Sequence, residues 1–167
     1  MSESIIIRRY QDNDLVACRD LWRELTEWHR EIYEDSTIGG DQPELYFDKH
    51  LATVGTNCLW VAEHQSQVIG LVGLETRDEE LFIEPLVVAS DHRGKGVGSQ
   101  LLEKAKLEAK QQGAKSLSVR PVTRNQRVIQ FLFKQGFQTL GHIQLFIDFT
   151  QSEWKTGPKL YGCNFKF

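Results

Sequence analysis

The chain reads LFIEPLVVASDHRGKGVGSQLLEKAKLEAKQQ from residue 81 to residue 112, and this stretch decides the fold. Its first nine residues form an apolar run with a single charge, which predicts a buried strand. A polar turn and a glycine-rich bend follow, and the composition and apolar spacing over 99–110 predict a helix. Strand, glycine-rich loop and helix N-terminus together predict an anion site, because unpaired N–H groups and the helix dipole point at the ligand there.

The spacing of the glycines restricts the kind of anion. A nucleoside-triphosphate loop needs G-x-x-x-x-G-K-[ST], and no such string occurs in the chain. A dinucleotide loop needs G-x-G-x-x-G, but here Ser99 stands where the third glycine would be. The bend does match R-x-x-G-x-G, with Arg93, Gly96 and Gly98. Glycine lets the backbone approach a phosphate closely, so we expect a phosphate-bearing ligand.

This match resembles the pyrophosphate loop of the GNAT superfamily of acetyl-CoA-dependent N-acetyltransferases. A second signature of that family, N-x-x-A-x-x-[LF]-Y-x-x-x-G-F, is similar to NQRVIQFLFKQGF at residues 125–137. The matching positions are Asn125, Phe131, Gly136 and Phe137. Val128 replaces the alanine of the signature, and Leu132 replaces its tyrosine. The resemblance implies acetyl-CoA as co-substrate and amine acetylation as the activity.

Size and composition set the broad class. With 167 residues and 40% hydrophobic content, the chain is expected to be a single domain over 1–167. It has no 18-residue apolar run, and its acidic N-terminus does not read as a secretory signal, so no membrane contact is expected. Three widely spaced cysteines without C-x-x-C predict a reducing, cytoplasmic compartment and no metal. No basic run is interleaved with aromatics, which argues against nucleic acid.

Hydrophobic periodicity predicts an α/β fold, with a mixed central sheet and helices on both faces. The expected strands cover 5–10, 59–64, 68–76, 81–89, 116–122, 137–149 and 159–167. The expected helices cover 12 or 13 to 33, 43–52, 99–110 and 125–135. The resulting order, β-α-α-β-β-β-α-β-α-β-β, is also that of the GNAT fold, and the resemblance covers nearly the whole chain.

Charge is divided unevenly along the chain. Residues 1–91 hold 7 Lys and Arg against 19 Asp and Glu, whereas residues 92–167 hold 13 against 4. A cationic partner would be steered to the acidic half, and an anionic one to the basic half that begins at the Arg93 loop. The alternative is a split without function, with the charges scattered over solvated faces.

The resemblance assigns the cofactor site to the strand, the loop and the second signature. The residues it implies are Leu86, Val87, Val88, Arg93, Gly94, Lys95, Gly96, Val97, Gly98, Ser99 and Asn125. In GNAT enzymes the strand before the loop splays at a bulge and pairs with the pantetheine arm, and the Val88 N–H is implied to stabilise the acetyl oxygen. Pro85 favours a bulge, since it cannot donate to a ladder. Asn125 could also serve as a helix N-cap.

Glu84 is the candidate general base, because it is the lone charge of the apolar run. The resemblance implies the same role, because many GNAT enzymes use a glutamate at this position to take the amine proton, often through water. Burial would destabilise the charged form of Glu84 and make it a better base near neutral pH. The alternative is a glutamate that faces solvent or pairs with an arginine. Leu132 cannot donate a proton to the leaving thiolate as the family tyrosine does, so solvent, Tyr161 or Tyr46 would have to.

The acceptor cleft of the GNAT fold is walled by the first two helices and their loop. The substrate-binding candidates there are Glu31, Tyr33 and Glu34, and their charge predicts a small cationic amine such as a polyamine or aminoglycoside. A polar surface loop without a ligand is the alternative. Two other functions stay open: acetylation of a protein N-terminus or lysine, and acetyl-CoA binding without turnover. A homodimer through a tail strand over 160–167 is a further expectation.

Overall fold

The computed structural model of the chain describes residues 4–150 and 152–167. The chain divides into two compact units, Met1–Arg120 and Pro121–Phe167. Each unit has its own internal contacts, and the expectation of a single domain over 1–167 stays a prediction.

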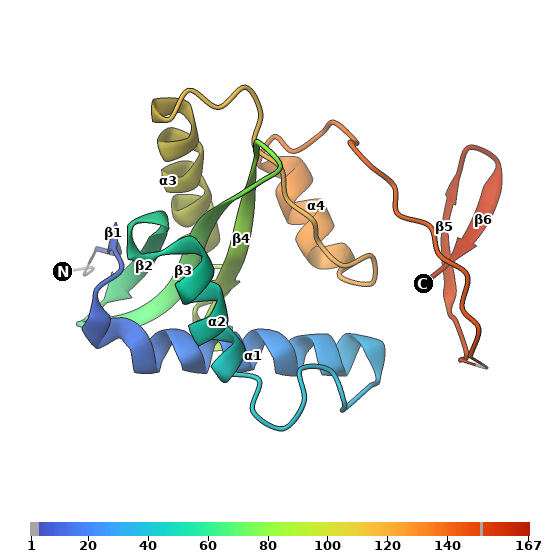
Figure 1. Ribbon diagram of the computed structural model, residues 1–167, viewed down its shortest axis with the longest axis horizontal. Helices are drawn as coiled ribbons and strands as arrows, with labels where there is room; N and C mark the ends of the chain where they lie inside the picture. Colours follow the sequence, from blue (N-terminus) through green and yellow to red (C-terminus); the bar gives the residue numbers. More distant parts are fainter. Residues whose placement is uncertain (1–3, 151) are drawn as a thin grey trace. The chain divides into compact units, whose positions relative to one another are not determined.

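The first unit is built on a four-stranded antiparallel sheet in the order β1-β2-β3-β4 (Figure 1). The strands are β1 (Ile6–Arg9), β2 (Leu59–His64), β3 (Gln67–Arg77) and β4 (Glu80–Val88). Two-residue turns at 65–66 and 78–79, with positive φ at every position, join β2 to β3 and β3 to β4. Such turns match the twist of a hairpin. The strands predicted over 59–64, 68–76 and 81–89 are therefore joined in sequence as two antiparallel hairpins.

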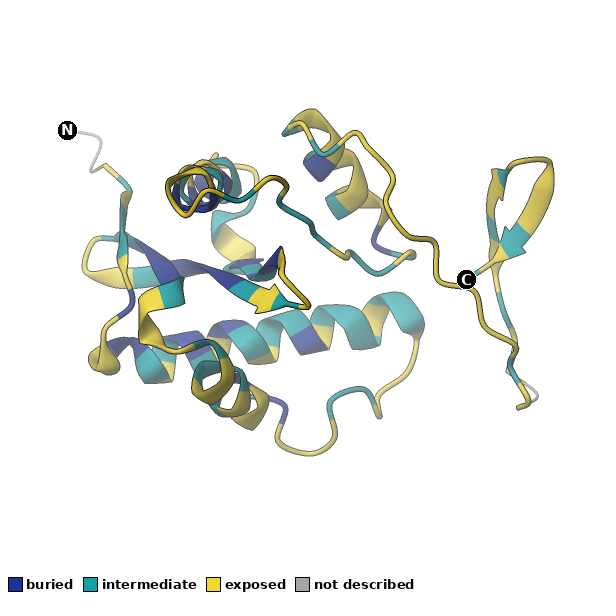
Figure 2. Cartoon of the chain, turned by 45° about the horizontal axis from the view of Figure 1, so that its top comes forward, coloured by how far each residue is buried: buried dark blue, intermediate teal, exposed yellow. Residues whose placement is uncertain are grey.

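Helices cover both faces of this sheet (Figure 2). They are α1 (Leu15–Tyr33) and α2 (Leu45–Val54) on one face and α3 (Val97–Gln111) on the other. The core on the first face includes Cys18 and Leu21 from α1, Phe47 from α2, and Val61 and Leu71 from the sheet. On the other face α3 packs closely, because a Cβ added to Gly70 would lie 2.9 Å from Leu101. The predicted fold class, an α/β structure with helices on both faces, is confirmed.

A bulge interrupts the pairing of β3 with β4. Val72 pairs with Leu86 but Leu74 pairs with Ile83, so two residues of β4 lie opposite Gly73. A Cβ on Gly73 would collide with the Glu84 carbonyl, which explains the glycine. The bulge that the proline in this strand predicted is therefore present.

Residues 116–122 do not form the predicted strand. Within this segment Ser118 makes a single parallel bridge with Phe82 of β4. Pro121 lacks an N–H and cannot extend the ladder. Arg120 instead lies over the Phe82 ring, 4.4 Å from its centre. The bridge adds a parallel pairing at the edge of the sheet, but the prediction of a full strand is wrong.

The second unit contains a capped helix and a hairpin. Its elements are α4 (Gln126–Lys134), β5 (Thr156–Leu160) and β6 (Cys163–Lys166). Asn125 is the N-cap of α4, since its Oδ1 accepts the Val128 N–H at 3.3 Å. The helix is close to its predicted bounds. The single tail strand predicted over 159–167 is wrong, because Tyr161 and Gly162 turn the chain there and β5 pairs antiparallel with β6.

The long strand predicted over 137–149 is also absent. These residues form no strand. Their exposed large apolar side chains are Leu140, Ile143, Leu145, Phe146, Ile147 and Phe149. Alternating hydrophobicity marks a segment that could form a strand, but a ladder needs a partner with matching side chains. No described part of the second unit forms a β-ladder with this segment, although Trp154 donates a hydrogen bond to Asp148.

Candidate functional site

The glycine loop (residues 93–98) leads from β4 into α3. It follows η3 (Ser90–His92), a single 3-10 turn. Gly94 and Gly96 have φ of +77° and +84°, which L side chains rarely adopt. A Cβ on either would meet nothing within 4 Å, so the glycines are needed for the backbone conformation and not for space inside the protein.

The first turn of α3 leaves backbone donors free beside this loop. Its first helical hydrogen bond runs from the Gln100 N–H to the Gly96 carbonyl, at 3.2 Å. The N–H groups of Val97, Gly98 and Ser99 precede it and therefore have no intrahelical acceptor. Val97 itself is 1% exposed and anchors the helix end on the sheet. The helix begins two residues earlier than predicted, and its free amides and dipole together suit an anion.

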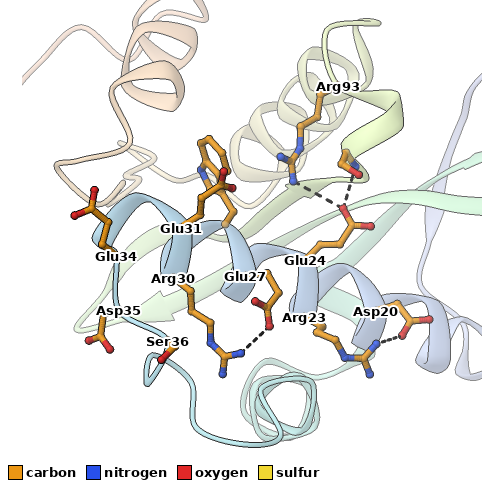
Figure 3. A pocket seen from close by; sticks show the side chains of 12 residues that line it. Asp20, Arg23, Glu24, Glu27, Arg30, Glu31, Glu34, Asp35, Ser36 and Arg93 are labelled. Atoms are coloured by element: carbon orange, nitrogen blue, oxygen red, sulfur yellow. Dashed lines mark hydrogen bonds and ion pairs between the residues drawn. The ribbon is translucent and has the colours of Figure 1, made fainter.

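Arg93, the first residue of the loop, is held against α1. Its Nε donates to the Val88 carbonyl at 2.9 Å, and its Nη2 lies 3.9 Å from the Glu24 carboxylate. Glu24 also accepts the Ser90 N–H at 2.9 Å (Figure 3). The Arg93 guanidinium lies 5.8 Å from the centre of the Trp28 ring. Sequence reasoning missed Glu24, since no sequence spacing relates it to the loop.

One edge of β4 is open near its end. The Ala89 N–H donates to the Ile69 carbonyl at 2.9 Å, so Ala89 and Val87 direct their backbone groups toward β3. Leu86 and Val88 alternate with them and direct their N–H groups to the opposite edge. No carbonyl in the described part of the chain accepts either of these N–H groups.

The three strand residues assigned to the cofactor therefore differ. Val87 uses its backbone within the sheet and buries its side chain in the core, where it is 4% exposed. Leu86 and Val88 present their N–H groups at the open edge, a few residues before the glycine loop. The open edge of β4 and the first turn of α3 thus hold two separate sets of available donors. Between them, the N–H groups of Ala89, Ser90, His92 and Arg93 all donate within the protein.

Glu84 is not buried, contrary to the expectation from its apolar neighbours. Its side chain is 44% exposed, and its Oε2 accepts a hydrogen bond from Arg77 Nη2 at 2.6 Å. Arg77 also donates twice to Glu75, at 2.7 Å each, and these bonds lower the pKa of Glu75. The physical reason is the hairpin, whose register places Arg77 across from the start of β4. Glu84 therefore pairs with an arginine, and its role as the general base stays a prediction.

His50 of α2 lies beside this ion-pair group. Its Nδ1 is 3.9 Å from Glu75 Oε2, and its ring centre lies 5.3 Å from that of Trp22, with the two planes tilted by 36°. Burial lowers the pKa of His50, although the negative charges of Glu75 and Glu84 act to raise it. The imidazole is therefore neutral at neutral pH. The sequence held one signal for this group: residues 75 and 77 are two apart on a strand and share a face.

An acidic hollow of about 850 Å³ runs along α1 to η3 and Arg93 (Figure 3). Its carboxylates are those of Asp20, Glu24, Glu27, Glu31, Glu34 and Asp35, and its arginines are Arg23, Arg30 and Arg93. The predicted substrate residues Glu31 and Glu34 line it. Tyr33 and the base candidate Glu84 do not.

Most charges of the hollow are already paired. Arg23 contacts Asp20 at 2.7 Å, and Arg30 contacts Glu27 at 2.6 Å. Asp35 accepts the Thr37 hydroxyl and N–H, and these bonds lower the pKa of Asp35. Glu31 is exposed and has no ion pair to any described residue. It is therefore the carboxylate best placed to meet a cation from solvent.

The residues of the second signature belong to the second unit. Asn125 is 6% exposed and caps α4, and Leu132 is 3% exposed. Leu132 and its neighbour Phe133 both have hydrocarbon side chains, which cannot donate a proton. Of the two other proton donors considered, Tyr46 lies beside Lys49 on α2, and Tyr161 is 83% exposed in the β5–β6 turn.

Two features are absent from the described residues. No helix in that part of the chain has the length and apolar content to cross a bilayer. No group of three or more His, Cys, Asp and Glu side chains is arranged there to hold a metal ion.

Comparison with known proteins identifies the family. A probable N-acetyltransferase, camello of Xenopus laevis, is 33% identical over 84 residues, which span 48% of this chain and 38% of that protein. A GNAT-family acetyltransferase of Staphylococcus aureus Mu50 shares the fold, with TM-score 0.66 and 19% identity over 90% of this chain and 94% of the other. The aminoglycoside N-acetyltransferase AAC(6')-Iy in complex with CoA also shares the fold, with TM-score 0.64 and 14% identity. That match covers 90% of this chain and 98% of the other. The model of the acetyltransferase (GNAT) family matches residues 22–137, and the chain belongs to this family.

Proposed function

We propose that the chain transfers an acetyl group from acetyl-CoA to a primary amine of a small cationic molecule, by direct attack in a ternary complex. The observation that carries the proposal is two sets of unpaired backbone donors on either side of the turn from β4 into α3. The first set is the N–H groups of Leu86 and Val88, and the second is those of Val97, Gly98 and Ser99. Membership of the GNAT family supports acetyl-CoA as the donor.

Each set of donors matches one part of the co-substrate. The diphosphate binds the free N–H groups of Val97, Gly98 and Ser99, where the helix dipole favours negative charge. The amide-bearing pantetheine arm binds as an added strand at the open edge of β4. The Val88 N–H then points at the thioester oxygen.

The reaction forms one bond and breaks another. The amine lone pair attacks the thioester carbon, and the carbonyl oxygen gains negative charge that the Val88 N–H stabilises. The C–S bond breaks, and the thiolate leaves and takes a proton from solvent, since a thiol of ordinary pKa about 8.5 is a tolerable leaving group. Glu84 accepts the amine proton through water, because four residues of strand separate it from Val88, roughly 13 Å between Cα atoms.

The acidic hollow supports the choice of a cationic acceptor. It carries six carboxylates against three arginines, and Glu31 is exposed within it. A concave site with an excess of one sign of charge raises the local concentration of the opposite ion. The hollow adjoins Arg93, so an amine held there lies next to the cofactor loop.

Release of free thiol from acetyl-CoA tests the proposal directly. The acceptor panel contains spermidine, an aminoglycoside, a lysine-containing peptide and an anionic amino-sugar phosphate. We expect turnover with the first two and little with the anionic amine. Preference for the peptide would favour a protein acetyltransferase. Coenzyme A binding without thiol release for any amine would mean a binding module, and the absence of coenzyme A binding would end the proposal.

A further inference from the structure

Glu24 lines the acidic hollow and also contacts Arg93, the first residue of the glycine loop. It lies on α1, more than sixty residues before the loop in sequence. Its Oε2 accepts the Ser90 N–H at 2.9 Å, and the same oxygen lies 3.9 Å from Arg93 Nη2. One carboxylate thus contacts the residues at both ends of the short segment that turns the chain from β4 into the glycine loop.

A second contact completes the connection. Arg93 Nε donates to the Val88 carbonyl at 2.9 Å, which ties the start of the loop back to the end of β4. The Arg93 side chain is 32% exposed and that of Glu24 40%, so these contacts lie at the surface. Surface ion pairs contribute little to stability. These contacts can still fix the direction of the glycine loop. That direction matters because the free N–H groups of α3 must converge on one point to bind a diphosphate.

We propose that Glu24 is a positioning residue for coenzyme A binding, acting through Ser90 and Arg93 to set the direction of the glycine loop. The inference rests on the proposed function, since it takes coenzyme A as the ligand of this loop. Glu24 touches no part of the ligand itself. It holds the backbone whose N–H groups do.

The sign of the effect distinguishes positioning from simple electrostatics. Coenzyme A is an anion, so removal of a nearby carboxylate should tighten its binding if only charge matters. If Glu24 orients the loop, its removal should weaken binding instead. Glu27 is the matched control, because it lies on the same helix and in the same hollow but pairs with Arg30 and does not touch the loop.

The experiment is calorimetric titration of coenzyme A into the full chain and three variants. We expect Glu24→Ala to weaken binding about tenfold, the order of one lost hydrogen bond to a charged group. Glu24→Gln keeps an oxygen for the Ser90 N–H and should lose only part of the affinity. Glu27→Ala should bind as tightly as the wild type or slightly more tightly. With an accepted amine, Glu24→Ala should raise KM for acetyl-CoA and leave kcat within about twofold.

Clear outcomes oppose the inference. Affinity for coenzyme A that is unchanged or improved in Glu24→Ala would overturn it, as would an equal loss in Glu27→Ala. Should the alanine variant not fold, Glu24→Gln decides alone, because any gain in affinity on loss of the charge contradicts positioning. A wild-type chain that takes up no coenzyme A would instead refute the proposed function, so the two failures are distinguishable.

Discussion

Glu84 and Glu75 share one arginine, and this sharing sets what each carboxylate can do. Glu75 is 14% exposed and receives two hydrogen bonds from Arg77, whereas Glu84 is 44% exposed and receives one. Glu75 is therefore held in place as the inner partner. Glu84 keeps one oxygen that solvent can reach, and a base that works through water needs such an oxygen.

Replacement of Glu84 by glutamine tests its role as the base. General acid–base catalysis is typically worth about 10²–10⁴-fold, and we expect Glu84→Gln to fall at the lower end, about a hundredfold in kcat, because the proton travels through water. The measurement is thiol release as a function of pH with the best amine of the panel. Glu79→Gln, in the turn before β4, is the control. Equal turnover of Glu84→Gln and wild type across pH would remove Glu84 from the mechanism.

Glu31 gives a separate test of acceptor choice. It is exposed in the acidic hollow without an ion pair among the described residues, so its charge is available to a cation. We expect Glu31→Gln to raise KM for spermidine about fivefold, equivalent to about 1 kcal/mol, with the Kd for coenzyme A unchanged. The effect should shrink as salt is added, because exposed charges are screened. A KM that does not respond to the substitution would place the acceptor elsewhere.

Among the secondary-structure elements, local sequence patterns were sufficient to predict β4, the glycine loop and α3. Their turn, glycines and helix follow one another in sequence, so no distant partner is needed to specify them. Gly94 and Gly96 adopt φ of +77° and +84°, a conformation that glycine permits. The strands expected over 116–122 and 137–149 depend on partners far away in the chain, which alternation does not specify. The contacts of Glu24 and of His50 with Glu75 were missed for the same reason, since they join separate elements.

The start of α3 allows a prediction with a closely matched control. Gly96 and Gly113 flank this helix, have φ of +84° and +75°, and would each accept a Cβ without contact. Alanine at either should cost about 1–2 kcal/mol of stability, because the left-handed conformation disfavours a Cβ. Only Gly96→Ala should also weaken coenzyme A binding, as measured by calorimetry. Equal affinities of the two variants would mean that the loop conformation does not matter for the ligand.

The uneven distribution of charge along the chain corresponds to one acidic region of the structure, the hollow beside α1. The acidic half of the chain contributes all six carboxylates of the hollow, from residues 20 to 35. Two of them, Asp20 and Glu27, are neutralised by Arg23 and Arg30, so the net charge of a sequence segment overstates the field at the site. Composition predicts a cationic partner, and the ion pairs decide which carboxylate of the hollow would be available to the cation that we propose.

Stability should depend on pH in two separate windows. Burial lowers the pKa of His50 below its ordinary value of about 6.5. As pH falls below that value the unfolded chain takes up a proton that the folded chain refuses, so stability decreases. The hydrogen bonds from Arg77 lower the pKa of Glu75, and its contribution is lost only as pH falls below the ordinary glutamate value of about 4.3.

Urea unfolding at a series of pH values separates the two windows. His50→Gln should flatten the decrease in unfolding free energy between about pH 6.5 and 5 and keep the decrease at lower pH. His29 retains part of the first slope in this variant, because burial lowers its pKa too. Glu75→Gln should do the reverse, sparing the histidine window and reducing the acid one. A His50→Gln slope equal to that of the wild type above pH 5 would show that the buried imidazole takes up its proton as readily in the folded chain as in the unfolded one.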